Sequence, residues 1–168
     1  MKAGLTDMFF EFHIQHDYKI GSNMYFHVHH LTNTNSNANT TIKWTANVSL
    51  AQLSYAGSLN PNSKYFQEAG GSVTLAPISH TYDASPQYRH VVTEVPLSTN
   101  GGSVTTLDSN KINVDSIILV RLRRDGAAVG DTASNNFVFV LQSDIHYQTS
   151  RIGTIRRTYD TGSYSFIV

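Results

Sequence analysis

The feature that most constrains the fold of this chain is a two-residue alternation of apolar and polar side chains. The alternation is clearest in TIKWTANVSL, residues 41–50, where every second residue is apolar. Successive side chains of a β-strand point to opposite faces, so this segment predicts a strand with one buried face and one solvated face. Its predicted buried residues are Ile42, Trp44, Ala46, Val48 and Leu50.

Several other segments also predict strands. MFFEFHI places Phe10, Phe12 and Ile14 on one face, and SIILVRLRR offers two alternating faces. NFVFVLQSDIHYQ is nearly continuous in apolar residues at its start, which favours a central strand covered on both faces. Further candidates are NMYFHVHH, SVTLAPI, YRHVVTEVPL, RIGTIRRT and YSFIV.

The segments between these strands are rich in Asn, Gly, Ser and Asp, which is typical of turns. None is long enough to be a domain linker, and SLAQLSYAGSL is the only stretch that could form even a short helical segment. We therefore expect residues 1–168 to form a single all-β domain. Its expected architecture is an antiparallel β-sandwich of jelly-roll type with about eight strands.

The composition excludes several classes of function. The 168 residues include no cysteine, which excludes disulfides, thiolate zinc sites and cysteine nucleophiles. The formal net charge is +0 and only 14% of residues are charged, so no global field attracts nucleic acid or anionic lipid. No apolar run reaches ~18 residues, and Asp7 and Glu11 interrupt the N-terminal run. We expect no membrane span and no signal peptide, and synthesis in a cytoplasm.

The strongest candidate for chemistry is a glycine followed by five residues and His-x-His. Gly21, His27 and His29 match the first half of the cupin metal signature, and the two histidines share one strand face. The acid that the signature supplies a few residues later is absent from LTNTN, and the second cupin motif is absent as well. Because Phe26 and Val28 are the natural core residues, we expect both histidines to point outward.

Other segments contain further possible ligands. Asp144 and His146 lie two residues apart in SDIHYQ, and FHIQHDY contains His13, His16 and Asp17. A site of two histidines and one carboxylate assembled from these strands is geometrically possible. Histidines on a solvated strand face are nevertheless common, and half of a motif is weak support. The prediction is therefore no catalytic, cofactor-binding or metal-binding residues.

No motif indicates an enzyme. The nucleophile-elbow, phosphate-loop and dinucleotide signatures are absent, and GAAVGDT is interpreted as a mobile hairpin loop. The acidic residues are too scattered to indicate a catalytic carboxylate pair. Phe9, Tyr25 and Tyr147 lie opposite the apparent core face, which indicates either an interface or a strand buried on both sides. Two groups of arginines are either solvated faces or contact patches for an acidic partner: Arg121, Arg123, Arg124, Arg151, Arg156 and Arg157.

Four segments resemble small structural proteins encoded by tailed bacteriophages: DMFFEFHIQHDYKIGSNMYFHVHHLTN, YRHVVTEVPL, VDSIILVRLRRDG and FVFVLQSDIHYQTSRIGTIRRT. The resemblance covers most of the chain and is weakest over residues 52–88. It implies a virion component on the capsid surface, a head decoration or cement protein with a jelly-roll fold. The partners that it implies are the major capsid protein and copies of this chain in a homotrimer, without nucleic acid or membrane. It implies no catalytic residue.

Three functions follow from the sequence. The preferred one is a decoration protein that binds the capsid lattice and stabilises the head. The alternative is a carbohydrate- or receptor-binding jelly roll of a phage fibre or tail, which tyrosines and asparagine-rich loops would suit. The third is a metal-dependent, cupin-like enzyme built on His27, His29 and either Asp144 or His146. Fold class does not separate them, because jelly rolls serve all three roles.

Overall fold

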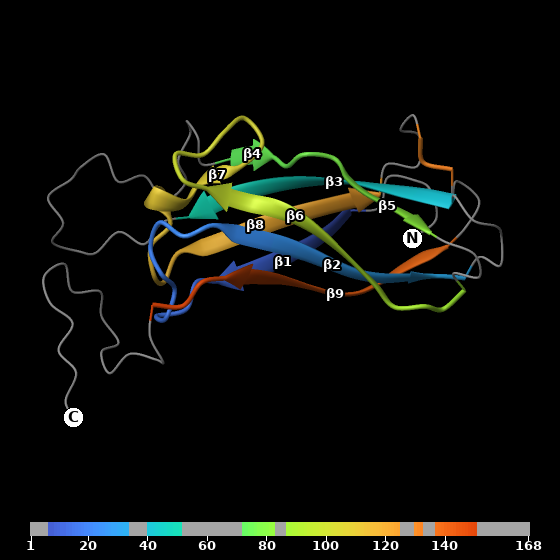
Figure 1. Ribbon diagram of the computed structural model, residues 1–168, viewed down its shortest axis with the longest axis horizontal. Coiled ribbons are helices and arrows are strands. Elements are labelled where there is room, and N and C mark those ends of the chain that lie inside the picture. The colour runs from blue at the N-terminus through green and yellow to red at the C-terminus, as the bar shows by residue number, and fades with distance from the viewer. Residues whose placement is uncertain are drawn as a thin grey trace, which may run out of the picture.

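A computed structural model of the chain shows two β-sheets stacked face to face (Figure 1). The structure describes residues 7–33, 40–51, 72–82, 87–124, 130–132 and 137–150. Within these residues the regular structure consists of nine strands and one short 3-10 helix, η1 (Ser109–Lys111). The prediction of an all-β fold built from mostly antiparallel sheets is confirmed.

The larger sheet has five strands, and β3 (Thr40–Ala51) lies at its centre. On one side, β3 pairs with β8 (Ile117–Arg124), which pairs in turn with β1 (Asp7–His13). On its other side, β3 pairs with two short strands, β4 (Ser72–Thr74) and β5 (Ile78–Tyr82), which lie end to end. All of these pairs are antiparallel.

The smaller sheet has four strands, in the order β7 (Leu107–Asp108), β6 (Val91–Thr99), β2 (Met24–Thr32) and β9 (Val138–Tyr147). β2 is antiparallel to both of its neighbours, whereas β6 and β7 are parallel. β2 is therefore covered by strands on both sides. β9 is at the edge of the sheet, with no strand beyond it in the part of the chain that the structure describes.

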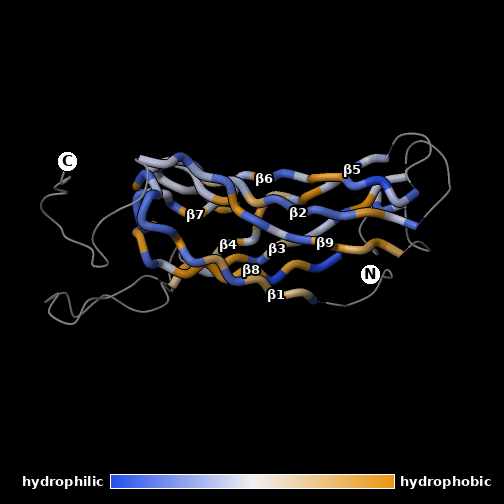
Figure 2. Tube along the Cα trace, turned by 90° about the horizontal axis from the view of Figure 1, so that it is seen from below, coloured by the Kyte–Doolittle hydropathy of each residue, from blue (hydrophilic) through white to orange (hydrophobic). Residues whose placement is uncertain are grey.

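A hydrophobic core fills the space between the two sheets. The five predicted apolar residues of β3 are each at most 1% exposed, which confirms the alternation in TIKWTANVSL. The sheets meet through contacts such as that of Phe12 on β1 with Phe26 on β2, whose ring centroids lie 6.1 Å apart. Burying one large apolar side chain is worth roughly 1.5–3 kcal/mol. The core therefore fixes which face of each strand points outward. Hydrophobic and hydrophilic residues alternate along much of the strands, as the colours of Figure 2 show.

The position of β9 shows that one prediction was wrong. NFVFVLQSDIHYQ forms an edge strand, not a central strand covered on both faces. Its register with β2 shifts at a bulge, which leaves Leu141 as an extra residue. Before the bulge Phe139 points outward and Val138 inward, whereas after it Asp144 lies on the outer face. The side chains at the start of this segment therefore alternate between the core and solvent, and those that face solvent are apolar as well.

Two strands were not predicted from the sequence, and several predicted segments lie outside the described residues. β5 and β7 were not predicted, because β5 has only a weak alternation and β7 is two residues long. The predicted strands RIGTIRRT and YSFIV and most of SLAQLSYAGSL lie outside the described residues. The same is true of Arg151, Arg156 and Arg157.

A buried ion pair joins the end of β8 to the segment 130–132. The side chains of Arg124 and Asp131 are both 0% exposed, with Arg124 Nη2 3.1 Å from Asp131 Oδ1. Arg124 Nε also donates to Asp131 Oδ2 at 3.2 Å, and the backbone N–H of Lys43 donates to the same oxygen at 3.2 Å. Arg124 is therefore not part of a solvated or partner-binding patch. Part of GAAVGDT is also anchored, because Thr132 donates its N–H to the carbonyl of Thr41.

Replacing Asp131 by asparagine should destabilise the fold strongly. The Asp131→Asn change removes the carboxylate charge that faces the buried guanidinium of Arg124, and breaking a buried ion pair typically costs about 3–5 kcal/mol. Urea unfolding should show a lower midpoint at unchanged slope. Asp7→Asn is the matched control, because Asp7 also binds arginines but from a solvent-accessible position, and it should have a much smaller effect. Equal losses in the two variants would contradict this assignment.

His30 is a buried histidine on the core face of β2. Its Nδ1 lies 2.8 Å from the Tyr82 hydroxyl and its Nε2 lies 2.8 Å from the Thr93 hydroxyl. Burial lowers the pKa of His30 from 6.5 to about 4, and the nearby His80, His90 and His29 act in the same direction. The folded protein therefore holds this imidazole in its neutral form.

This pKa shift predicts acid sensitivity. Between pH 6.5 and about 4 the unfolded chain binds a proton at His30 that the folded chain does not bind. The contribution of His30 to stability is therefore present above pH 6.5 and is lost as the pH falls, with a magnitude on the order of 3 kcal/mol. The measurement is the free energy of unfolding against pH for the unsubstituted chain and His30→Gln. The variant should show a shallower fall, and an identical slope would refute the prediction.

Candidate functional site

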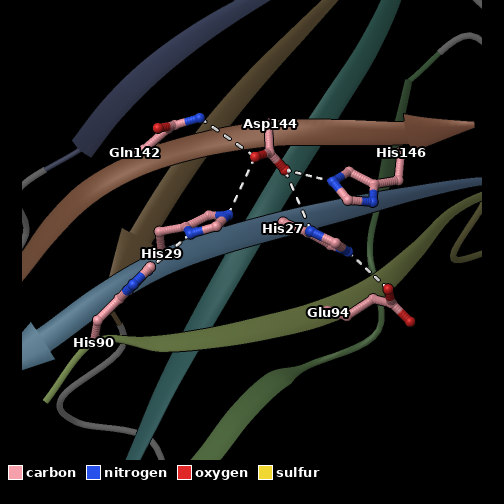
Figure 3. Close-up of polar contacts among 7 residues, drawn as sticks. All are labelled: His27, His29, His90, Glu94, Gln142, Asp144 and His146. Atoms are coloured by element: carbon pink, nitrogen blue, oxygen red, sulfur yellow. Dashed lines mark hydrogen bonds and ion pairs between the residues drawn. The ribbon is translucent and has the colours of Figure 1, made fainter.

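The outer face of the smaller sheet carries a cluster of histidines and carboxylates (Figure 3). Phe26 and Val28 are 0% exposed in the core, so His27 and His29 lie on the opposite face of β2, as predicted. The strand register places Glu94 of β6 on one side of His27 and Asp144 of β9 on the other. The cluster is therefore a consequence of pairing β2 with both neighbours.

His27 bridges the two carboxylates. Its Nε2 lies 2.7 Å from Oε2 of Glu94, and its Nδ1 lies 3.3 Å from Oδ1 of Asp144. His146, paired with Tyr25 on the same face, places its Nε2 3.6 Å from the same Asp144 oxygen. The His27 and His146 rings lie close together, with centroids 4.0 Å apart.

A second group of side chains holds the other oxygen of Asp144. His29 Nε2 lies 3.1 Å from Oδ2, and the amide nitrogen of Gln142 donates to Oδ2 at 3.4 Å. The Nδ1 of His29 in turn lies 2.9 Å from Nε2 of His90. Although His29 Nε2 lies close to Asp144, the two atoms are not aligned for a hydrogen bond, and this nitrogen has no hydrogen-bond partner. Asp144 is thus oriented by neighbours from both β2 and β9.

Burial differs across the cluster. The side chain of His27 is 10% exposed and that of Asp144 is 29% exposed, whereas that of His146 is 62% exposed. Asp144 Oδ1 is itself buried and accepts no hydrogen bond. A buried carboxylate oxygen without a hydrogen bond is costly, and this one faces the nitrogens of His27 and His146 at 3.3 and 3.6 Å. His27 Nδ1, Asp144 Oδ1 and His146 Nε2 lie within 4.8 Å of one another, which makes them a possible ligand set for a metal ion.

The other predicted ligand group is arranged differently. His13 Nε2 and His16 Nε2 both contact Oδ1 of Asp115, at 3.2 and 2.9 Å. Asp17 instead accepts a hydrogen bond from the Tyr147 hydroxyl at 3.1 Å. Burial, together with this bond to a carboxylate, raises the pKa of Tyr147 to about 12. The structure therefore separates Asp17 from the two histidines with which the sequence grouped it.

Gly21 has a conformational role. It lies in the turn before β2 with a φ of 82°, a left-handed value that favours glycine. The turn borders an open polar depression of about 710 Å³. The lining includes Gly21, Asn23, Tyr25, Asn100 and Asn110. The spacing from Gly21 to His27 thus reflects a turn followed by a strand.

The remaining arginines of β8 form ordinary ion pairs on the outer face of the larger sheet. Arg121 Nε lies 3.0 Å and Arg123 Nε 2.6 Å from the carboxylate of Asp7. The hydrogen bond from Arg123 is the main cause that lowers the pKa of Asp7, and the charge of Arg121 adds to it. Arg121 and Arg123 therefore match the interpretation as a solvated face. Arg124 is buried, so it belongs neither to a solvated face nor to a partner-binding patch.

An apolar strip lies at the start of β9. Phe137 and Phe139 are each 46% exposed and Leu141 is 54% exposed. The two phenylalanine rings stack with centroids 6.5 Å apart. Of the aromatic residues that the sequence placed opposite the core, Phe9 is 75% exposed, whereas Tyr147 packs against the core. We call Phe137, Phe139 and Leu141 the β9 apolar strip.

Sequence reasoning did not single out Glu94, His90 or the β9 apolar strip. Glu94 and His90 join the site only through the register of β6 with β2, and no local pattern marks them. The exposed phenylalanines were visible in the sequence as an uninterrupted apolar run, but that run was assigned to a central strand.

No family model matches the chain, and no curated protein or solved structure is significantly similar to it. The described residues contain no helix with the length and hydropathy needed to cross a bilayer.

Proposed function

We propose that this chain is a structural protein of a tailed-bacteriophage virion, a head decoration or cement protein that binds the major capsid lattice. The observation that carries the proposal is the edge of β9, which pairs with no further strand among the described residues and lies beside the β9 apolar strip. The sequence resemblance supplies the virion context. The function consists of contact with other proteins, so the proposal assigns no catalytic residue.

The strand order supports a jelly-roll topology for this role. In a jelly roll the chain winds as two Greek keys between two sheets. Here it passes from β1 to β2 and back to β3, and later from β6 through β8 to β9, changing sheet at each of these steps. β8 lies between β1 and β3, and β2 lies between β6 and β9. The smaller sheet ends at β9, beyond which no strand lies among the described residues.

The β9 edge has the chemistry of a docking site for an extended segment. An edge strand offers unpaired N–H and C=O groups to an incoming strand. Exposed aromatic and aliphatic side chains beside such an edge supply apolar area, which is typical of interface cores. The proposed occupant is an extended segment of the major capsid protein or of a second copy of this chain in a homotrimer.

Capsid binding is tested by co-sedimenting the purified chain with capsids of the encoding phage that lack it. Leu141→Asp places a charge in the β9 apolar strip and should weaken lattice binding by roughly tenfold or more, as loss of an interface anchor does. Val104→Asp is the matched control, because Val104 is 90% exposed outside this strip, and it should bind normally. Both variants should retain the unfolding midpoint of the unsubstituted chain.

Two results would refute the proposal. One is that the unsubstituted chain does not sediment with its capsid under assembly conditions. The other is that Leu141→Asp binds the lattice as tightly as Val104→Asp does. Images of the intact particle provide a separate check, because the proposal expects the density of this chain on the head.

A carbohydrate-binding role is the second candidate, favoured by the polar depression beside Gly21. Asn23, Asn100 and Asn110 offer amide groups, and Tyr25 offers a ring on which a sugar can stack. If this role is correct, the chain should bind defined glycans on an array, and Asn100→Ala should reduce that binding. An array without hits, together with density on the head, would eliminate this candidate.

A further inference from the structure

We propose that His27, Asp144 and His146 bind one divalent transition-metal ion of the zinc class on the outer face of the smaller sheet. The ligand atoms are His27 Nδ1, Asp144 Oδ1 and His146 Nε2, which lie within 4.8 Å of one another (Figure 3). The site uses residues other than those of the β9 apolar strip, so its test does not depend on the virion role.

The distances of Asp144 from the two imidazole nitrogens fit a tetrahedral ion. Two ligands at about 2.1 Å from zinc, separated by the tetrahedral angle, lie about 3.4 Å apart, whereas adjacent ligands of an octahedral ion lie about 3 Å apart. The distances from Asp144 Oδ1 to His27 Nδ1 and to His146 Nε2 are 3.3 and 3.6 Å. Both distances are close to the tetrahedral value. His146 is the most exposed of the three, so its ring is free to adjust to the ion.

Glu94 prepares His27 to act as a ligand. A metal-binding histidine usually donates its second ring N–H to a carboxylate, which fixes the tautomer and makes the ring more basic. The 2.7 Å contact between His27 Nε2 and Glu94 Oε2 places the proton on Nε2. Nδ1 is then the ring nitrogen that faces Asp144, and in the neutral ring it offers its lone pair to a metal ion.

Asp144 carries the observation that most favours a bound cation. Its Oδ1 is buried and accepts no hydrogen bond, although two imidazole nitrogens lie nearby. Lone pairs that face each other repel, and a positive charge between them, supplied by a proton or a metal ion, removes this repulsion. The other oxygen, Oδ2, is oriented by His29 and Gln142. A metal ion would satisfy Oδ1 and both nitrogens together.

Two histidines and one carboxylate leave part of the coordination sphere open. Zinc sites with three protein ligands keep a fourth position for water or another oxygen ligand. Cys-rich structural sites are closed, and this chain has no cysteine. His146 also lines the polar depression, so the open position is reached from solvent.

The test is calorimetric titration of the untagged chain with ZnCl₂, followed by a visible spectrum with CoCl₂. We expect one Zn²⁺ per chain, and cobalt bands of tetrahedral type. His146→Ala should abolish tight binding. Because the His146 side chain is largely exposed, this change should not unfold the chain, so a loss of binding would reflect a lost ligand. Glu94→Gln should weaken binding by about 10–100-fold, as loss of a partner behind a ligand does.

His13→Ala is the matched control. His13 is half exposed and also contacts a carboxylate, but it lies on β1 away from the cluster. It should leave zinc affinity and the cobalt spectrum unchanged. The proposal is overturned if the unsubstituted chain takes up no stoichiometric zinc, or if His146→Ala binds as the unsubstituted chain does. Equal losses in His13→Ala and His146→Ala would overturn it as well.

Discussion

The pairing of β2 with both β6 and β9 is the constraint on which the rest of the structure depends. The same register buries Phe26 and Val28 and places His27 between Glu94 and Asp144. Side chains alternate along a strand, so a slip of one residue would move the core residues to solvent and the histidines inward. The apolar contacts between the sheets therefore also fix the geometry of the polar cluster.

Much of the fold could be predicted from alternation alone, and the failures have physical causes. In β3 every predicted core residue is buried, because apolar and polar side chains alternate without interruption from Thr41 to Leu50. β9 does not, because the bulge at Leu141 changes which residues point outward and the edge leaves apolar side chains exposed. Arg124 has the same parity as Leu122, so alternation places it inward. A charged residue is normally expected at the surface, and the buried partner of Arg124, Asp131, could not be predicted because it lies in a loop.

The candidate site was predictable only in pieces. His27 with His29, and Asp144 with His146, are visible in the sequence as pairs two residues apart on one strand face. That the two pairs meet depends on β9 lying beside β2, a long-range pairing that no local pattern encodes. Glu94 is found only through the register of β6. The sequence thus indicated ligand types, whereas the sheet topology determined which of them converge.

A single strand, β9, carries the proposed docking strip at its beginning and two proposed metal ligands toward its end. Any chain that added itself along this edge would order the backbone from which Asp144 and His146 project. Thermodynamic linkage requires such an influence to be mutual. If both proposals are correct, zinc binding at Asp144 and His146 and the docking of a chain along β9 would each change the affinity of the other.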